Sequence, residues 1–363
     1  MGLKIGIVGL PNAGKSTVFN ALSKGRAHVA NYPFTTIEPN AGVAVVPDER
    51  LNRLADIYKP GKATPTTIEF VDVAGLVKGA SSGEGLGNQF LGHIKEVDAV
   101  LHVVRCFDDS NVVHVSGTID PKRDIGIVDA ELCLKDLDAV EARRRKLEKA
   151  AKSNDPDVRT GLGVCEKAAK LLERGIPVRK EVWSKEEAPH LAALKLLTQK
   201  PVLYCANVNE SELPRGSRHA DRIREMAERD GSRLVVICGK VEAEVSELSI
   251  EEGQLYLKEF GLEESGLHQL IHLSYELLDL VTFLTVNENE VRAWTIRKGT
   301  KAPQAAGVVH TDFERGFIRA EVMRFDDLAR YGNPQAVKEK GLYRLEGREY
   351  VVQDGDVIYF RSG

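Results

Sequence analysis

The sequence predicts an α/β protein: a mainly parallel sheet with helices on both faces, an inserted antiparallel helical arm, and a C-terminal β-rich domain. Three observations support this prediction. Residues 4–24 read as a short apolar strand, a glycine-rich loop and an amphipathic helix. A stretch that begins near residue 130 repeats apolar side chains every three or four positions, which is typical of a helix. From residue 281 to 363, strand patterns dominate.

Composition bounds the class of protein. The 363 residues, 42% of them hydrophobic, suffice for two or three domains. A formal net charge of −4 argues against a protein that coats nucleic acid nonspecifically, although it allows a local basic patch. The apolar run at the N-terminus is too short for a secretory signal or a membrane span. The five scattered cysteines indicate reduced thiols, so a cytoplasmic protein without a membrane partner is expected.

The segment GLPNAGKST, residues 9–17, carries the first motif. It matches G-x-x-x-x-G-K-[ST] at Gly9, Gly14, Lys15 and Ser16, between a predicted strand and a predicted helix. The glycines let backbone N–H groups turn inward around a phosphate chain, and the helix presents its N-terminus to the anion. Lys15 is predicted to reach the β- and γ-phosphates, and the Ser16 hydroxyl to bind Mg²⁺. This pattern is that of a P-loop NTPase.

A second motif, DVAG, ends the next apolar strand pattern. Asp72 can hold Mg²⁺ through water, and the Gly75 N–H group can meet a γ-phosphate. Between the two motifs, the proline-broken loop 31–42 offers hydroxyl groups that could close on Mg²⁺ when the γ-phosphate is present. Thr36 is the first choice for this switch residue and Thr35 the second. The alternative is that these threonines only shape a turn.

The residue directly after this motif leaves a catalytic gap. Ras-like GTPases carry a glutamine there that orients the attacking water, whereas this chain has Leu76. Leucine cannot polarise water, so either hydrolysis is slow or another group acts. One candidate is His114, in the loop after the predicted strand 98–107; the alternative is a loop histidine without chemistry. A second hypothesis is a K⁺ ion bound by the amide oxygen of Asn12 beside the phosphates.

The segment PVLYCANVNE, residues 201–210, ends where guanine readers carry Asn-Lys-x-Asp. Asn207 is retained, but Val208 replaces the lysine and Glu210 the aspartate. Guanine offers two donors that an aspartate accepts, whereas adenine offers its 6-amino group and ring acceptors, which the Asn207 amide can serve. The longer Glu210 side chain is misplaced for the guanine edge, so the pattern favours ATP over GTP. Backbone N–H groups at residues 238–240 are a further candidate contact for the base.

A long insertion lies between the predicted strand that ends near residue 107 and the one that begins near residue 201. Its pattern predicts a helical arm over residues 124–199. In its first helix, side chains that can form one seam recur every three or four positions. They are Ala130, Cys133, Leu137, Val140, Arg144, Leu147 and Ala151. Residues 155–161 are predicted to form a turn, and two more helices follow. Residues 141–152 form a basic stripe, which is either a solvated helix face or a contact for structured RNA.

The remaining parts complete the domain prediction. Residues 1–123 and 200–280 are assigned to the nucleotide-binding domain. Residues 281–363 hold two strands, a short helix near KAPQAAGVV and further strands, an order typical of a β-grasp fold. Glu-Gly and Asp-Gly pairs in this part mark tight turns. Since it shows neither metal-ligand spacing nor a nucleophile pattern, a binding module is expected.

Several segments together resemble the Obg-like ATPases of the YchF type. These segments are GLPNAGKST, NYPFTTIEPNAG, DVAGLVKGASSGEGLGNQFL, NVNE, TDFERGFIRAEV and VVQDGDVIYF. The likeness runs over almost the whole chain, and the motifs are highly specific in combination. It implies a preference for ATP within a GTPase-class fold, a hydrophobic residue at Leu76, association with ribosomes and a TGS-like C-terminal domain. The chain departs from the family at Cys238-Gly239, where members commonly show Ser-Ala.

The resemblance also implies roles for single residues. The triphosphate would be bound by Asn12, Ala13, Gly14, Lys15, Ser16 and Thr17. Ser16 and Thr36 would hold Mg²⁺, and Asn207 with Val208 would contact adenine. 

The sequence therefore predicts a Mg²⁺-dependent ATPase that acts as a slow molecular switch. Its two nucleotide states would change its affinity for a large partner, the ribosome or structured RNA, through the arm and the TGS-like domain. No membrane and no sequence-specific DNA partner is expected. Two alternatives stay open: a GTPase translation factor with relaxed base choice, and a nucleotide-sensing scaffold without meaningful turnover.

Overall fold

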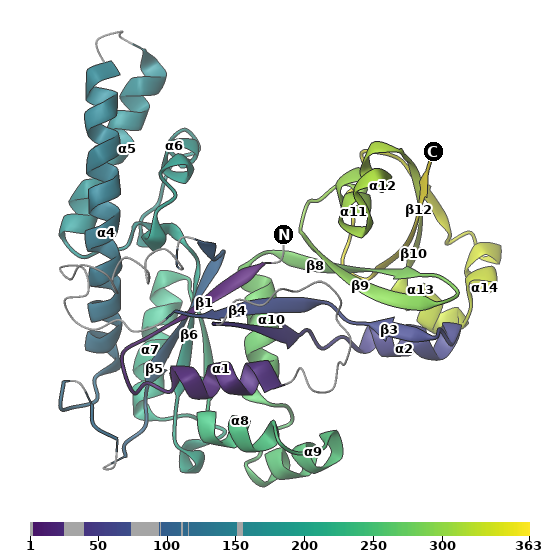
Figure 1. Cartoon of the computed structure of the whole chain (residues 1–363), viewed down its shortest axis with the longest axis horizontal. Coiled ribbons are helices and arrows are strands. Elements are labelled where there is room, and N and C mark those ends of the chain that lie inside the picture. The colour runs from purple at the N-terminus through teal and green to yellow at the C-terminus, as the bar shows by residue number, and fades with distance from the viewer. Residues whose placement is uncertain are drawn as a thin grey trace. The chain divides into compact units, whose positions relative to one another are not determined.

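The chain divides into two compact units, each with its own sheet. The computed structural model describes residues 3–24, 40–73, 94, 96–109, 112–114, 116–150 and 155–363. The first unit comprises Met1–Ala44 and Glu69–Leu273, and the second comprises Val45–Ile68 and Ser274–Gly363. Figure 1 shows the elements of both units. Within the described part of the chain, no helix combines the length and apolarity needed to span a bilayer.

The first unit is built on a mainly parallel sheet. Its strands among the described residues are β1 (Lys4–Val8), β2 (Ala41–Val45), β4 (Thr67–Asp72), β5 (Ala99–Arg105), β6 (Val202–Asn207) and β7 (Arg233–Ile237), in the order β2-β4-β1-β5-β6-β7. β1 pairs in parallel with β4 and β5, and β6 pairs in parallel with β5 and β7. Parallel strands end at one edge of a sheet, so the loops that follow them meet there.

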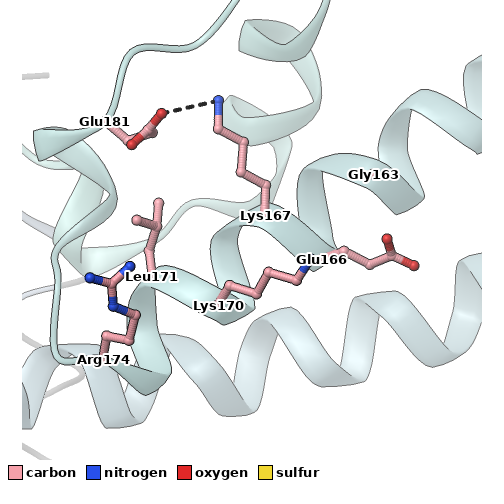
Figure 2. Close-up of a pocket in the computed structure, with 7 residues that line it drawn as sticks. All are labelled: Gly163, Glu166, Lys167, Lys170, Leu171, Arg174 and Glu181. Atoms are coloured by element: carbon pink, nitrogen blue, oxygen red, sulfur yellow. Dashed lines mark ion pairs between the residues drawn. The ribbon is translucent and has the colours of Figure 1, made fainter.

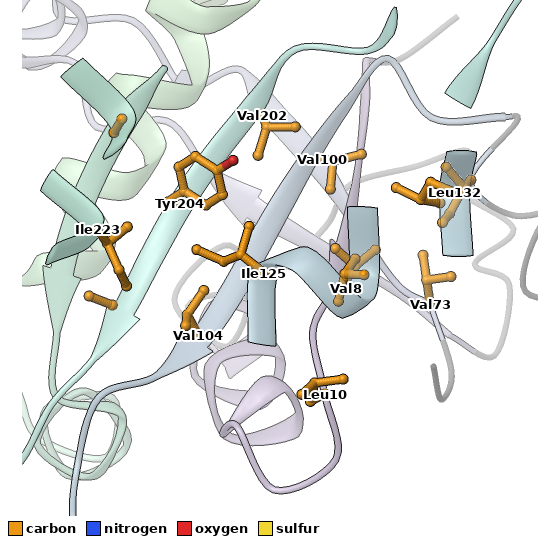
Figure 3. Close-up of a cluster of buried hydrophobic side chains, with 14 of the residues drawn as sticks. Val8, Leu10, Val73, Val100, Val104, Ile125, Leu132, Val202, Tyr204 and Ile223 are labelled. Carbon is orange, nitrogen blue, oxygen red and sulfur yellow. The ribbon is translucent and has the colours of Figure 1, made fainter. Parts of the chain in front are cut away.

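Helices cover both faces of this sheet, as the sequence predicts. On one face, α4 (Pro121–Ala150) and α7 (Arg218–Asp230) pack Ile125 and Ile223 against Val104 and Tyr204 of the sheet (Figure 3). The other face carries α1 (Lys15–Lys24), α8 (Gly239–Val245) and α10 (Gly266–Leu277), with α9 (Ile250–Glu259) beside α8. β5 and β6 are consequently buried along their whole length.

The arm begins as a continuation of the core. The first half of α4 packs on the sheet, and its second half packs against α5 (Pro156–Glu173), which returns alongside it (Figure 1). The helix α6 (Glu187–Leu194) and the short helices η3 (Val178–Lys180) and η4 (Leu197–Gln199) complete the arm. The predicted turn at residues 155–161 is wrong: Asp155 accepts a hydrogen bond from Asp157 N, which starts α5 at Pro156.

Buried polar contacts fix the root of the arm. The Asp136 carboxylate accepts hydrogen bonds from Leu197 N at 2.8 Å, from Thr198 N at 2.7 Å and from the Thr198 hydroxyl at 2.6 Å. About two helical turns earlier on α4, Asp129 pairs with Arg179 at 2.6 Å. Each carboxylate is buried and fully paired, so losing one partner would leave a charge in the core.

The second unit has the predicted C-terminal sheet with a helix packed on it, but the prediction of one short helix is wrong, because three further helices follow between Thr311 and Glu339. Its sheet among the described residues contains β3 (Lys62–Thr64), β8 (Leu280–Val286), β9 (Glu290–Arg297), β10 (Phe317–Arg324), β11 (Arg344–Glu346) and β12 (Asp356–Ser362), in the order β11-β10-β12-β8-β9-β3. The hairpin β8–β9 is antiparallel, and β12 returns parallel to β8. The helix α11 (Ala302–Val309) packs Ala302, Ala305 and Ala306 on this sheet, and α12 (Thr311–Arg315) follows it.

A segment from the N-terminal part of the chain completes this second sheet. β3 pairs in parallel with β9, and α2 (Glu49–Tyr58) buries Leu51 and Leu54 against Leu284 and Val291. The helices α13 (Phe325–Tyr331) and α14 (Pro334–Glu339) join the same cluster. Nothing local in residues 45–68 signals this partner, because an amphipathic helix does not specify the surface that it covers.

In the first unit, the Glu242 side chain connects α8 to the start of α10. Its carboxylate accepts hydrogen bonds from Gly266 N at 2.7 Å and Leu267 N at 3.4 Å, at a helix N-terminus that favours negative charge. The side chain is nevertheless almost completely buried, and burial raises the pKa of Glu242 to about 7 against the partial opposition of these bonds. The fold therefore favours the protonated acid.

This buried acid predicts a pH dependence of stability. Because the folded pKa of about 7 exceeds the ordinary value of 4.5, the contribution of Glu242 to stability is fully present below pH 4.5 and is lost as the pH rises through 7. A shift of this size corresponds to roughly 3 kcal/mol. The variant Glu242→Gln should therefore lose less unfolding free energy than the wild type between pH 5 and pH 8, as measured by urea denaturation.

The exposed residue Glu228 of α7 supplies a matched control. Glu228→Gln should keep the wild-type difference between the two pH values. An equal difference in wild type and Glu242→Gln would mean that Glu242 is not the titrating group.

Candidate functional site

The loop between β1 and α1 has the backbone shape that a phosphate cradle needs. Gly9 and Gly14 have φ angles of 152° and 97°, which side-chain-bearing residues rarely adopt. A Cβ atom at Gly9 would lie 2.2 Å from Val103 O, and one at Gly14 would lie 2.2 Å from Asn207 Nδ2. Both positions therefore require glycine for space as well as for conformation.

Lys15 is the first residue of α1 and points back into this loop. Its ammonium group donates to Leu10 O at 2.9 Å. Burial lowers the pKa of the Lys15 ammonium group, and the Asp72 carboxylate partly opposes this shift. A phosphate would offer Lys15 a charged acceptor in place of the neutral carbonyl group, which is a stronger hydrogen bond.

Asp72 ends β4 beside the same loop. Its register opposite Ile7 brings it to the edge of the sheet where β1 ends. Burial raises the pKa of Asp72, while the charge of Lys15 opposes the rise. Its Oδ1 atom is buried without a hydrogen-bond partner among the described residues. An orphaned carboxylate oxygen next to a phosphate cradle fits a hard cation such as Mg²⁺, which prefers oxygen ligands and keeps several waters.

This cation would depend on phosphate as well as on protein. Within the described residues, no group of three or more His, Cys, Asp or Glu side chains could hold a metal by itself. Ser16, at the start of α1, supplies the only other predicted ligand that the structure describes; Thr36 lies outside the described residues. The donor set is thus that of an ion held jointly by a few oxygens and a bound phosphate chain.

Asn207 ties the phosphate loop to the last motif. Its Nδ2 atom donates to Ala13 O at 3.0 Å, and its Oδ1 atom accepts from Gly239 N at 2.9 Å. The side chain is only 5% exposed. Any contact of Asn207 with a base would have to use the one remaining N–H group or the second lone pair of Oδ1.

One large cavity collects the phosphate loop and the predicted base reader. Its volume is about 860 Å³. The predicted site residues that line it are Asn12, Gly14, Lys15, Ser16, Thr17, Asn207, Val208 and Glu210. The strand ends therefore bring together two motifs that lie almost 200 residues apart. Of the other predicted site residues, Ala13 contributes its backbone through Asn207, whereas Gly75, Leu76 and Thr35 lie outside the described residues.

The base end of the cavity is shaped by the segment after β6. The Val208 side chain is 2% exposed and packs in the core, and its N–H group donates to Ile237 O at 2.8 Å. The Glu210 carboxylate pairs with Lys240 Nζ at 2.5 Å across the cavity rim. Position 208 thus offers no long aliphatic wall for a purine, and Glu210 is engaged by a cation.

The segment 238–240, predicted as a backbone contact for the base, also lines this cavity. Other lining residues have no counterpart in the sequence-based prediction: Phe107, Asp109, Val112, Asn209, Ser211 and Ala243. The loop after β5 could have been included by the same rule, because its strand neighbours β1 and β6 in the sheet.

His114 lies on another side of the phosphate loop. Together with Asp124, it lines a small cavity against Leu10, Pro11 and Ala13, whereas the large cavity is lined from this loop by Val112. His114 is therefore near the phosphate loop but is not among the described residues that line the nucleotide-sized cavity.

A second cavity of about 280 Å³ lies on the arm (Figure 2). Lys167 is fully engaged there: it donates to Val182 O at 2.9 Å and lies 3.5 Å from Glu181 Oε1. Lys170 and Arg174 line the same hollow one helical turn apart, without an ion-pair partner among the described residues. These two side chains thus place exposed positive charge on α5.

Comparisons with known proteins match the whole chain. A family described as 50S ribosome-binding GTPase matches residues 4–140, and a family named for the C-terminus of YchF GTPases, described as a protein of unknown function, matches residues 280–363. Two curated relatives, each named ribosome-binding ATPase YchF, are 51% identical to this chain. They come from Bacillus subtilis (strain 168) and Escherichia coli O157:H7, and each alignment covers 99% of both chains.

A solved structure is similar over the same length. The YchF GTPase of Schizosaccharomyces pombe superposes with a TM-score of 0.89 at 40% sequence identity, covering 99% of this chain and 98% of that one.

The contact between Gly14 and Asn207 predicts the effect of one methyl group. In Gly14→Ala the added Cβ would lie 2.2 Å from Asn207 Nδ2, so Asn207 must move and its bond to Ala13 is lost. Nucleotide affinity should fall by at least about tenfold, or 1.4 kcal/mol. A titration with a fluorescent nucleotide measures this change.

Gly126→Ala is the matched control, because a Cβ at this exposed position of α4 meets nothing within 4 Å. It should keep wild-type affinity and gain up to about 1 kcal/mol of stability from helix propensity. Unchanged nucleotide affinity in Gly14→Ala would contradict the role given to the Asn207 bridge.

Proposed function

This chain belongs to the YchF family, and we propose that it is a Mg²⁺-dependent ATPase that binds ribosomes. The observation that carries the proposal is the single cavity in which the phosphate loop and the Asn207–Glu210 segment meet. Its volume suits a purine nucleoside triphosphate. The relatives from Bacillus subtilis and Escherichia coli, 51% identical and each named ribosome-binding ATPase YchF, support both halves of the proposal.

The preference for ATP follows from the absence of the two guanine-reading side chains at the base end of the large cavity. A guanine reader needs an aspartate that accepts two hydrogen bonds from the base edge, and here Glu210 replaces it and pairs with Lys240. A guanine reader also uses a lysine stem over the ring, and here Val208 is packed into the core. Backbone groups near Val208 and Gly239, together with what remains free on Asn207, would then serve the adenine edge.

The roles of the phosphate end follow from its residues. The backbone from Asn12 to Thr17 would bind the triphosphate, and Lys15 would neutralise it. Ser16 and Thr36, with Asp72 through water, would hold Mg²⁺, whose chemistry is to neutralise charge on the phosphate oxygens. Gly75 N–H would meet the γ-phosphate.

Hydrolysis would be slow because Leu76 cannot orient water. His114 is the proposed group that acts on water in its place. A K⁺ ion beside Asn12 would add the positive charge that the site lacks. If K⁺ acts in this way, replacing it with Na⁺ lowers turnover.

The two alternatives differ in measurable ways. A GTPase translation factor would bind GTP at least as tightly as ATP. A nucleotide-sensing scaffold would keep partner binding in Lys15→Ala, which removes the main phosphate contact. The absence of the guanine-reading pair at Val208 and Glu210 favours the ATPase over the first alternative.

A side-by-side titration of ATP and GTP tests the proposal. We expect ATP to bind at least about tenfold more tightly than GTP, which corresponds to 1.4 kcal/mol. The double change Val208→Lys with Glu210→Asp restores the guanine-reading pair and should move the ratio toward GTP. Glu210→Asp alone leaves the buried Val208 in place and is the control for loss of packing.

Equal or tighter binding of GTP by the wild type would overturn the proposed base preference. If the double variant folds and still rejects GTP, groups other than Val208 and Glu210 decide the base.

We propose that different parts of the chain bind the nucleotide and the ribosome. Residues 1–123 and 200–280, without the segment 45–68 that pairs with the second sheet, would bind nucleotide. The arm, residues 124–199, and the TGS-like domain, residues 281–363 with the segment 45–68 that pairs with it, would contact the partner. Such a partner would place the protein in the cytoplasm.

Unpaired cations on the arm support contact with ribosomal RNA. Arg143, Arg145, Lys146 and Lys149 are exposed on α4, and no ion pair joins them to a described acid. Arg144, in contrast, is held by Glu141 and Glu148. Free cations release counterions when they meet phosphates, which makes such binding dependent on salt.

Removing two of these cations should weaken ribosome binding. Arg145→Ala with Lys149→Ala should reduce co-sedimentation affinity and lower the slope of log K against log salt by about two. The control, Arg222→Ala with Arg229→Ala, removes two exposed cations from α7 and should leave the slope unchanged. Equal slopes for all three proteins would exclude α4 as the contact surface.

A further inference from the structure

Both ring nitrogens of His114 are occupied. Nε2 lies 2.8 Å from Asp124 Oδ2, and the backbone N–H group of Ser116 donates to Nδ1 at 3.0 Å. The side chains of His114 and Asp124 are 6% and 5% exposed. A histidine that takes a proton from water needs one unprotonated nitrogen open to that water. In this arrangement His114 has none.

The two contacts select one tautomer. Because Ser116 N–H is a donor, Nδ1 must be the unprotonated acceptor. The ring proton then sits on Nε2 and is donated to the carboxylate of Asp124. The opposite tautomer would turn Nδ1–H toward the Ser116 N–H group and leave Nε2 facing a carboxylate without a proton between them.

Asp124 is itself held in place from its other side. Its Oδ1 atom accepts from Arg123 Nε at 3.2 Å and from Arg123 Nη2 at 3.1 Å. Arg123 also donates to the Thr118 hydroxyl at 3.1 Å. Asp124 lies in the first turn of α4, and its N–H group donates to Asp120 O. The carboxylate is therefore a fixed anchor, whereas His114 belongs to a loop.

The same loop is tied to the nucleotide cavity. Asn12, in the phosphate loop, donates from Nδ2 to Val113 O at 3.0 Å. Asn12 lines the large cavity, whereas His114 and Asp124 line the small one. A nucleotide that engages the Asn12 side-chain amide thus competes with the bond that holds the residue next to His114.

We propose that Asp124 is a positioning residue that retains His114, as the Nε2–H tautomer, away from the nucleotide cavity. Nucleotide contact at Asn12 weakens this retention through Val113. The inference rests on the proposed ATPase function, in which His114 acts on water. It adds that turnover is limited by the fraction of molecules in which His114 has left Asp124.

Asp124→Asn tests the retention. It keeps the shape of the side chain but replaces a charge-assisted hydrogen bond with a neutral one, which is weaker by roughly a factor of two in energy. If His114 is mostly retained, the released fraction and kcat should rise about fivefold, with KM for ATP nearly unchanged. A fall in kcat would overturn the proposal, because it would mean that Asp124 orients His114 for catalysis.

Two controls separate retention from general damage to α4. Asp120→Asn removes a carboxylate from the start of the same helix; Asp120 accepts a bond from Arg123 N but does not touch His114. Its kcat should equal that of the wild type. In a His114→Ala background, Asp124→Asn should have no effect on kcat. A rise in either control protein would contradict action through His114.

A spectroscopic measurement tests the retention of His114 by Asp124 independently of turnover. In protein labelled with ¹⁵N-histidine, His114 should show a protonated Nε2 and an unprotonated Nδ1, and this signature should change when a non-hydrolysable ATP analogue and Mg²⁺ are added. In Asp124→Asn the tautomers should mix before any nucleotide is added. A protonated Nδ1 in the wild type would refute the proposal, even if Asp124→Asn did not fold.

Different results would contradict the ATPase activity and the retention of His114. A wild type that binds ATP but does not hydrolyse it contradicts the proposed ATPase, and the histidine signature still tests the retention. A wild type that hydrolyses ATP, with Asp124→Asn equal to Asp120→Asn in kcat, contradicts the retention alone.

Discussion

The nucleotide site depends on the two hydrogen bonds of the Asn207 amide. One reaches Ala13 O in the phosphate loop, and the other comes from Gly239 N at the start of α8. Both backbone partners are buried with Asn207, so losing the amide leaves them unsatisfied at a cost of about 1–3 kcal/mol each. The bridge sets the distance between the part of the cavity that suits phosphates and the part that suits a base. It is possible only because Gly14 has no side chain.

The sequence predicts the architecture of the first unit well, because its signals are local. A strand, a glycine loop and a helix stand next to one another in residues 4–24, and the rule that parallel strands end at one edge brings Lys15 and Asn207 together. Hydrogen bonds between a side chain and residues far away in the sequence have no local sequence signal. The sequence suggests a base contact for Asn207, but it does not reveal that the amide already bridges two backbone groups. Likewise, nothing in residues 45–68 indicates that they complete a sheet of the other unit.

The arm shows how an insertion keeps a defined direction. Apolar packing alone would allow α4 and α5 to rotate slightly about their axes, because aliphatic side chains of similar volume can replace one another in the contact. Asp136 and Asp129, at the root of α4, bind specific partners in η4 and η3, so that one rotation satisfies both carboxylates. The exposed cations further along α4 therefore have a defined orientation relative to the sheet of the first unit. The same helix carries Asp124 in its first turn, so the arm and His114 share one structural support.

The second unit is assembled from two separate stretches of chain, Val45–Ile68 and Ser274–Gly363. A cut before residue 280, placed where a conventional domain boundary would be drawn, therefore releases no self-sufficient piece. The distal fragment would present the unpaired backbone edge of β9, and the proximal fragment would carry α2 with Leu51 and Leu54 uncovered. Each fragment would invite aggregation, so deletion studies of this chain would report on damaged folds unless the break is placed with the interleaved connectivity in mind.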